Sequence, residues 1–386
     1  AGNLIFPPLL GNQAGSETLV SLLSFAVTAV VFPVLGVIAV SKTGGLTKLA
    51  DRVGKRFSLV FTTAIYLSIG PGLGIPRAGS VPFEMAVAPY LSADFNQNLA
   101  RLIYTGLFFL VAYLLCIKPN KLVNRMGKFL TPSLLLLILF LFLGMLGLDK
   151  NVAAPLDAYK ESAFAKGFIE GYNTMDAVAA LNFGLVISLA IKRFGVENDK
   201  EVVNYSLKSG FLAGGLLFVV YAMLSYIGKI TSNVFVGAEN GAEILSQSSQ
   251  LVFGSFGSLL MAAIFTLACL TTCVGLITSG SEYFTGLFKE KLSYKAWVRI
   301  WTSLSFVVAN FGLNKILSVS VPILQIIYPV ALVLIIMGIS HDFMKYTRLS
   351  YLLTAAIALV IPMVEVAYNY LPQLKNLFLL FGKLPL

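Results

Sequence analysis

One polar stretch, EGYNTMD at residues 170–176, divides an apolar segment of the chain into two halves, residues 163–169 and 177–191. The segment as a whole is long enough to cross a membrane. A helix interrupted within it exposes backbone N–H and C=O groups that lipid cannot satisfy. Such a break persists at membrane depth where it lines a cavity or binds something. The stretch therefore marks a candidate site in a membrane protein.

A second break lies at the start of the chain, where GNLIFPP occupies residues 2–8. A glycine, an amide and two prolines stand there in an apolar context. Proline lacks the backbone N–H and clashes with the preceding turn, so a helix cannot run through this stretch unperturbed.

The composition identifies lipid as the solvent for most of the chain. Hydrophobic residues make up 57%, charged residues 12%, and the mean hydropathy is +0.84. A soluble domain carries about 25% charged residues. Apolar segments long enough, or nearly long enough, to span recur at residues 18–41, 57–75, 102–117, 130–148, 163–191, 211–230, 253–284, 297–311, 316–339 and 351–368. We expect an all-α integral membrane protein.

The two ends of the sequence hold apolar fragments that are too short to span. They are residues 1–10 and the stretch from about 374 to 386. We therefore expect about twelve spans in the full protein, with the first and the last truncated here.

The positive charges are arranged as membrane topology rather than as a binding face. The net charge is +10, and most of the 28 Lys and Arg residues lie in five gaps, at 42–56, 118–128, 192–208, 289–299 and 345–348. These gaps alternate strictly with gaps poorer in Lys and Arg. The positive-inside rule places the rich gaps in the cytoplasm. The pattern predicts a plasma-membrane protein in contact with lipid and no nucleic-acid partner.

The two breaks fall in the first span and, counting onward, in the sixth. Five spans separate equivalent positions, and an odd number inverts the second half relative to the first. This is typical of an inverted repeat with a site at the repeat interface. Within one transmembrane domain, residues 1–386, we expect repeat one at about 1–148, repeat two at about 162–340 and additional spans at about 350–386. The alternative is that each Gly or Pro merely kinks its helix.

The broken helices suit a zwitterionic substrate such as an amino acid. Helix N-termini present N–H groups to a carboxylate, and helix C-termini present carbonyls to an ammonium group. Side-chain amides and hydroxyls add polar contacts. The predicted substrate-binding residues are Gly2, Asn3, Leu4, Gly171, Tyr172, Asn173, Thr174 and Asp176. Asp176 is the acidic group among them, and it serves either as a cation or ammonium partner or as the N-cap of the outgoing half-helix.

The eighth span contains Ala268, Thr271 and Thr272 on one helix face, at positions i, i+3 and i+4. The carbonyl of the first and the hydroxyls of the other two are oxygen ligands that suit a small cation such as Na⁺. Threonine hydroxyls in membrane helices also bond back to the preceding turn, and on spacing alone this structural interpretation is favoured.

Two further charged residues, Arg77 and Glu84, flank the outer end of the third span. They form either an extracellular gate or a structural ion pair, and we favour structure. Cys116, Cys269 and Cys273 lie in apolar segments and are interpreted as small buried side chains.

The chain resembles the branched-chain amino acid:cation symporters (BrnQ type). The resemblance rests on AGNLIFPP at residues 1–8 with Gly11 and QAG at 13–15, and on PVLGVIA at 33–39. It continues with IPR at 75–77, FE at 83–84 and GYNTMDA at 171–177, and it covers essentially the whole chain in order.

The resemblance implies the five-plus-five inverted-repeat fold of the amino acid–polyamine–organocation superfamily, with Leu, Ile and Val as substrates. It also implies a sodium site at Ala268, Thr271 and Thr272. This implication reverses the interpretation favoured by spacing alone, in which the threonine hydroxyls only bond back to the preceding turn. The remaining sodium ligands would be carbonyls upstream of Ala1. Proton-coupled relatives place a lysine in the fifth span. Residues 130–148 contain none, and Lys128 stands at the cytoplasmic end, which favours Na⁺.

We therefore expect a sodium-coupled importer of branched-chain amino acids that works by alternating access, with Na⁺ as coupling ion and no other cofactor. A proton-coupled carrier or a carrier of another amino acid is the first alternative, and a channel is the second. We do not expect an enzyme, because the sequence shows no cluster of nucleophile, base and metal ligands.

Overall fold

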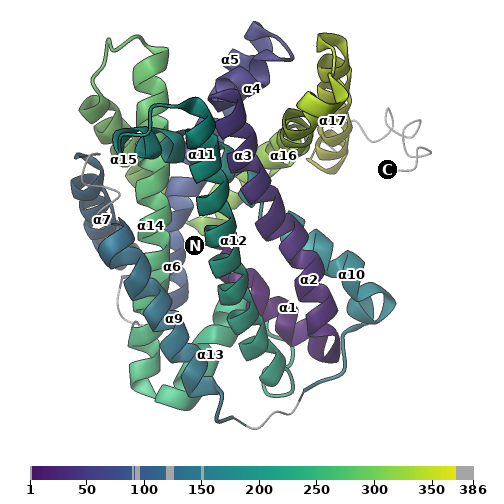
Figure 1. Ribbon diagram of the computed structural model, residues 1–386. Helices are drawn as coiled ribbons and strands as arrows, with labels where there is room; N and C mark the ends of the chain where they lie inside the picture. The colour runs from purple at the N-terminus through teal and green to yellow at the C-terminus, as the bar shows by residue number, and fades with distance from the viewer. Residues whose placement is uncertain (1, 89–90, 92–95, 119–125, 149–151, 371–386) are drawn as a thin grey trace.

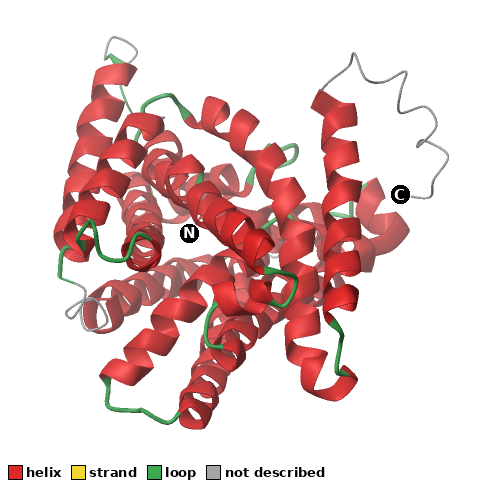
Figure 2. Ribbon diagram, turned by 90° about the horizontal axis from the view of Figure 1, so that it is seen from above, coloured by secondary structure: helices red, strands yellow, loops and turns green. Residues whose placement is uncertain are grey.

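The structure is a computed structural model that describes residues 2–88, 91, 96–118, 126–148 and 152–370. Within these ranges the chain forms helices joined by loops and turns, and no strand (Figure 2). The α-helices are α1 (Phe6–Ala14), α2 (Thr18–Ala26), α3 (Phe32–Thr43), α4 (Leu46–Asp51), α5 (Lys55–Leu67), α6 (Gly74–Ala86), α7 (Gln97–Cys116), α9 (Thr131–Met145), α10 (Asp157–Tyr172), α11 (Asp176–Arg193), α12 (Asp199–Ile230), α13 (Gly241–Phe253), α14 (Ser255–Leu287), α15 (Tyr294–Ala309), α16 (Leu313–Met344) and α17 (Arg348–Tyr370).

Short 3₁₀ and π segments begin or link several of these helices. They are η1 (Gly2–Ile5), η2 (Gly15–Glu17), η3 (Val27–Val31), η4 (Ser68–Gly72) and η7 (Met126–Leu130). Eight stretches of the described residues are long and apolar enough to cross a membrane, and the bent pair α10 and α11 makes a ninth. The fold is therefore all-α and multi-span, as the sequence predicts. The last apolar stretch, from about residue 374, lies outside the described residues.

The first two predicted segments are joined by a turn at Gly15, whose φ of 51° is in the left-handed region. A side chain there would also overlap with the carbonyl of Ala153. Glycine meets both demands because it lacks a Cβ. The chain then runs through α2, η3 and α3 in one direction (Figure 1).

The third span corrects a prediction. The sequence predicts one apolar span over residues 57–75 with no break in it, but α5 stops at Leu67 and the chain resumes as α6 only at Gly74. Gly70 has non-helical angles (φ −74°, ψ −121°), and α6 continues to Ala86. The Gly70-Pro71-Gly72 sequence explains the interruption, since it combines a missing N–H with two flexible residues.

The sixth span is broken where the sequence predicts it. α10 ends at Tyr172, α11 begins at Asp176, and the two helix axes differ by 45°. Met175 lies between them in the left-handed conformation (φ 55°, ψ 25°).

Glycines bring the two halves of the molecule into close backbone contact. A Cβ on Gly11 of α1 would overlap with the Ser225 carbonyl of α12, and one on Gly228 of α12 would overlap with the Pro8 carbonyl. Gly171 of α10 likewise faces the Phe25 carbonyl of α2. Small residues allow helices in lipid to approach this closely. The pairs α1–α12 and α2–α10 therefore hold the elements of the two breaks together.

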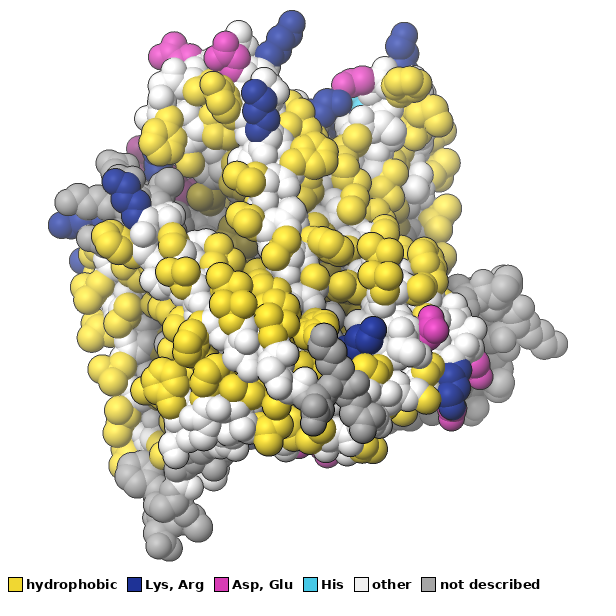
Figure 3. Space-filling view, turned by 60° about the horizontal axis from the view of Figure 1, so that its bottom comes forward, with side chains coloured by type: hydrophobic (Ala, Val, Ile, Leu, Met, Phe, Trp, Pro, Cys, Tyr) yellow, Lys and Arg dark blue, Asp and Glu magenta, His cyan; other side chains and the backbone are white. Residues whose placement is uncertain are grey.

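The outer surface matches a lipid environment. Leucine, valine, isoleucine and phenylalanine side chains are exposed along α7, α9, α12 and α17. Figure 3 shows hydrophobic side chains over most of one face, with charged side chains near its upper edge and lower right. The α3–α4–α5 turn and the α16–α17 connection, both rich in Lys and Arg, lie at the upper end of Figure 1. The positive-inside rule makes that end cytoplasmic.

Candidate functional site

The two predicted breaks meet through their side chains. Asn3 of η1 donates from Nδ2 to Asp176 Oδ1 at 2.5 Å and to the Thr174 carbonyl at 3.3 Å. These residues are 173 positions apart in the sequence, so the contact is purely tertiary. The fold thus brings the amide of the first break to the carboxylate of the second.

Asp176 is the first residue of α11 and does not cap it. The N-cap position is occupied by Met175, and no side chain caps the helix. The second carboxylate oxygen of Asp176 accepts a hydrogen bond from the Tyr221 hydroxyl of α12 at 3.4 Å. The N-cap interpretation of Asp176 is therefore wrong, and its carboxylate is held from two other helical segments.

Two tyrosines line the same region, and the sequence analysis did not single them out. Tyr221 is 2% exposed, and Tyr328 of α16 is fully buried. The Tyr328 ring packs edge-on against Tyr172, with ring centroids 4.6 Å apart, and its hydroxyl has no side-chain partner among the described residues. The available signal was a tyrosine inside an otherwise apolar span, which by itself does not say which neighbour it faces.

The other predicted residues of the breaks lie in different surroundings. Leu4 is buried in an apolar cluster, and Tyr172 is half-buried beside Tyr328. Gly171 and Thr174 are buried, and the Thr174 hydroxyl donates to the Gly171 carbonyl at 2.7 Å. Asn173 is exposed at the end of α10 and is not brought to Asn3. Gly2 begins η1.

Arg77 and Glu84 do not form the pair considered from the sequence. Glu84 accepts from Arg101 of α7 at 2.9 Å. Arg77, on α6, forms no ion pair among the described residues, and its guanidinium interacts electrostatically with Asp176. The α6 helix also contacts η1, α14 and α16. Arg77 and Asp176 therefore bring a positive and a negative side chain to the region of the breaks, and no ion pair joins them among the described residues.

The three predicted sodium ligands lie together on α14. Thr271 Oγ1 donates to the Ala268 carbonyl at 2.8 Å, and Thr272 Oγ1 donates to the same oxygen at 3.2 Å. These bonds are those that threonine makes in many membrane helices. They also place two hydroxyl oxygens around one carbonyl. Ala268 belongs to the same apolar cluster as Leu4 of η1.

The described residues contain no group of three or more His, Cys, Asp and Glu that is placed to hold a metal ion. All three cysteines are buried and unpaired, as the sequence predicts.

Comparison with known proteins identifies the family. The family model described as "Branched-chain amino acid transport protein" matches residues 1–386. The chain belongs to this family.

Relatives in this family include two branched-chain amino acid permeases of Bacillus subtilis. The chain is 42% identical to BraB over 91% of its own length and 79% of the relative, and 42% identical to BrnQ over 89% and 79%. It is 35% identical to the permease BrnQ of Lactobacillus delbrueckii over 92% and 81%. The chain is therefore a multi-pass protein of a bacterial cell membrane.

The fold has a solved counterpart. The crystal structure of MhsT in complex with L-phenylalanine superposes with a TM-score of 0.59 over 94% of this chain and 95% of that one. The identity is 16%, so the likeness establishes a shared transporter fold and nothing about the ligand. The match and the helical spans confirm the expected all-α, multi-span fold.

Proposed function

We propose that this protein imports branched-chain amino acids together with Na⁺, by alternating access around a site between η1–α1 and α10–α11. Support comes from membership of the branched-chain amino acid transport family and from the permeases with which the chain is 42% identical. Transporters with this type of fold bind substrate near the bilayer midplane, where interrupted helices meet.

The observation that carries the proposal is the carboxylate of Asp176, which lies at the junction of the two breaks. A charge inside a membrane protein is costly and needs a partner. Asn3 and Tyr221 supply hydrogen bonds to it, and no cationic side chain forms an ion pair with it among the described residues. The ammonium group of an amino acid supplies that charge, so Asp176 is its proposed ligand.

The carboxylate of the substrate needs donors on the opposite side. The first N–H groups of η1, from Gly2 to Leu4, are unpaired by helix geometry and carry the positive end of the helix dipole. Arg77 adds a guanidinium that has no ion pair among the described residues. A zwitterion placed between Asp176 and these donors satisfies both charges at once.

The aliphatic side chain is proposed to lie against the apolar residues around Leu4. That cluster includes Leu224 of α12 and Phe265 and Ala268 of α14. The rings of Tyr172 and Tyr328 close the region from α10 and α16. Discrimination among aliphatic side chains by such a surface amounts to about 1–3 kcal/mol per methylene.

The Na⁺ ion is proposed to bind the Ala268 carbonyl with Thr271 Oγ1 and Thr272 Oγ1. The two hydroxyl oxygens already lie 2.8 and 3.2 Å from the Ala268 carbonyl oxygen. Hydroxyl rotation would turn both protons away and point the oxygen lone pairs at the ion. Binding beside Leu4 would couple the ion to the substrate through the first break.

Uptake of labelled leucine into proteoliposomes tests the proposal. We expect accumulation with an inward Na⁺ gradient, competition by isoleucine and valine, and loss of accumulation when choline replaces Na⁺. Full uptake in choline would overturn the sodium coupling but leave the substrate proposal intact. Failure of leucine to show counterflow would favour a channel.

A proton-coupled carrier is the second candidate, and Asp176 favours it too. A half-buried carboxylate between membrane helices is the kind of group that carries protons in transporters. An inward proton gradient in choline would then drive leucine accumulation. Sodium-dependent uptake that is insensitive to the proton gradient would exclude this mechanism.

A further inference from the structure

A cavity of about 720 Å³ opens between the start of α5 and the start of α17, well away from the helix breaks. Its walls come from the α4–α5 turn and from the first three turns of α17. Both helices begin at the upper end in Figure 1, the end that the positive-inside rule places in the cytoplasm. The cavity therefore lies at the level of the cytoplasmic headgroups.

Three cationic side chains line the mouth of this cavity, namely Lys55, Arg56 and Arg348. All three are exposed, and none forms an ion pair within the part of the chain that the structure describes. Asp51 also lines the cavity, which leaves an excess of positive charge. Unpaired cations around a concave surface favour an anionic ligand.

The cationic mouth is built by contacts between the two helices. Arg348 Nε donates to the Val53 carbonyl at 3.2 Å. Arg52 donates to the hydroxyl of Tyr351 at 2.8 Å, and its guanidinium also lies over that ring, 5.7 Å from the centroid. These contacts tie α17 to the α4–α5 turn, so the cations lie on a defined framework.

The inner wall of the cavity is apolar. It consists of Phe57 on α5 and Leu352, Ala355, Ala356 and Leu359 on α17. Residues 352, 355, 356 and 359 share one helix face by their spacing. The face runs about 10 Å along the helix into the membrane, at 1.5 Å per residue. An anionic group at the mouth and a hydrocarbon chain along this face would fill the cavity.

We propose that this cavity binds an anionic glycerophospholipid of the inner leaflet. Its phosphate would contact Lys55, Arg56 and Arg348, and an acyl chain would lie along Leu352–Leu359. Basic pockets between membrane helices on the cytoplasmic side bind anionic headgroups in other proteins. The proposal is independent of the transported substrate, since it uses none of the residues of the helix breaks.

Native mass spectrometry of the purified, delipidated protein tests this site. The probes are dioleoyl phosphatidylglycerol, dioleoyl phosphatidylcholine and inorganic phosphate. We expect one phosphatidylglycerol to bind more tightly than any further copy. Lys55→Gln with Arg56→Gln should weaken that binding roughly tenfold or more, because each cation near the surface contributes to anionic-lipid binding. Ala356→Trp should weaken it with all charges retained, because it fills the apolar wall.

The matched control is Lys291→Gln with Lys295→Gln, which removes two exposed cations on the same side, one in the α14–α15 connection and one at the start of α15. It should leave the tight phosphatidylglycerol unchanged. Equal losses in both double variants would reduce the effect to surface charge and overturn the site. Equal binding of phosphatidylcholine, equal binding of phosphate alone, or a wild-type protein that binds no tight phosphatidylglycerol would overturn it as well.

Discussion

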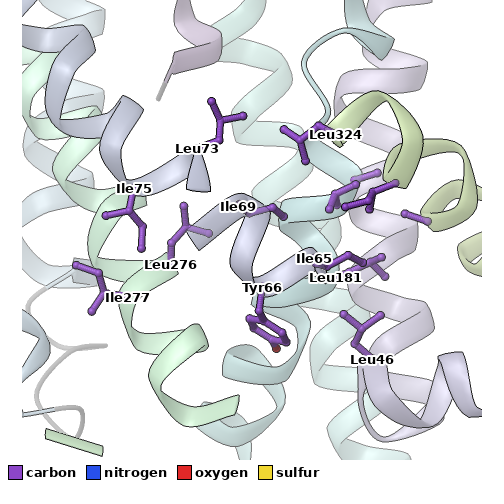
Figure 4. Packing of buried hydrophobic residues seen from close by; sticks show 14 of the residues in the cluster. Leu46, Ile65, Tyr66, Ile69, Leu73, Ile75, Leu181, Leu276, Ile277 and Leu324 are labelled. Carbon is purple, nitrogen blue, oxygen red and sulfur yellow. The ribbon is translucent and has the colours of Figure 1, made fainter. Parts of the chain in front are cut away.

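The third and sixth spans are both interrupted at Gly-containing stretches, yet the two breaks differ in what surrounds them. In the third span, Gly70 faces the ring of Trp301, and Ile69, Leu73 and Ile75 are buried. Figure 4 shows the side chains of Ile69, Leu73 and Ile75 near Leu276 of α14, around the bend. In the sixth span, the break carries Asp176, whose carboxylate accepts hydrogen bonds from the Asn3 amide and the Tyr221 hydroxyl of other segments.

The polar groups at the two breaks are matched to different extents. The Gly72 carbonyl of the third span accepts from Ser320 of α16 at 2.7 Å. Near Asp176 the side chains are less completely matched: among the described residues neither its carboxylate nor the Arg77 guanidinium forms an ion pair, and the Tyr328 hydroxyl has no side-chain partner. A broken helix packed by apolar groups is a structural bend, whereas one with unmatched polar groups is a candidate site.

Asp176→Asn should have the largest effect. It keeps the shape of the side chain and removes the charge proposed for the substrate ammonium, so leucine uptake should fall about 100-fold, as expected for a lost charged hydrogen bond. Uptake kinetics and thermal stability of the purified variant are the measurements. Near-normal uptake would place the ammonium elsewhere, and Asp176→Glu tests whether charge alone restores activity.

Gly70→Ala should act on stability instead. Its Cβ would overlap with the Trp301 ring, which is 2% exposed, and such overpacking costs about 1–3 kcal/mol. Thermal unfolding in detergent should show the loss of stability as a lower unfolding temperature, and the folded fraction should transport leucine normally. Gly215→Ala is the control, because no atom lies within 4 Å of a Cβ there. A selective transport defect would make the third-span break functional too.

Thr271→Ala and Thr272→Ala extend the comparison to the proposed ion site. Each removes one oxygen beside the Ala268 carbonyl, so the Na⁺ concentration for half-maximal uptake should rise roughly tenfold. Uptake at several Na⁺ concentrations gives this value. Wild-type sodium dependence in both variants would show that the threonines only bond to their own helix.

Ser320→Ala should have the smallest effect. It leaves the Gly72 carbonyl without its side-chain donor, at a cost of about 0.5–1.5 kcal/mol, and leaves uptake unchanged. Thermal unfolding and leucine uptake, measured on the same preparation, distinguish the two outcomes. A strong uptake defect would indicate that the bend at Gly70 moves during transport.

Local chemistry made much of the fold predictable. Hydropathy located the spans, and Gly and polar residues located the break at residues 170–176, because backbone satisfaction in lipid depends on the segment itself. At residues 2–8 the structure shows the start of a helix, η1 followed by α1. The third-span break was missed because Gly70-Pro71-Gly72 carries no polar side chain. The partners of Arg77 and Glu84 were misjudged because both sit near one span end, while Arg101 lies on another helix.

The sequence by itself determined that this is a multi-span helical membrane protein with two polar interruptions, since hydrophobic length and helix-breaking residues act over a few turns of chain. The tertiary structure decided that Asn3, Asp176 and Tyr221 meet, and that Gly70 accommodates Trp301. These contacts join residues up to 231 positions apart. Which break becomes a site therefore depends on what the other helices bring to it.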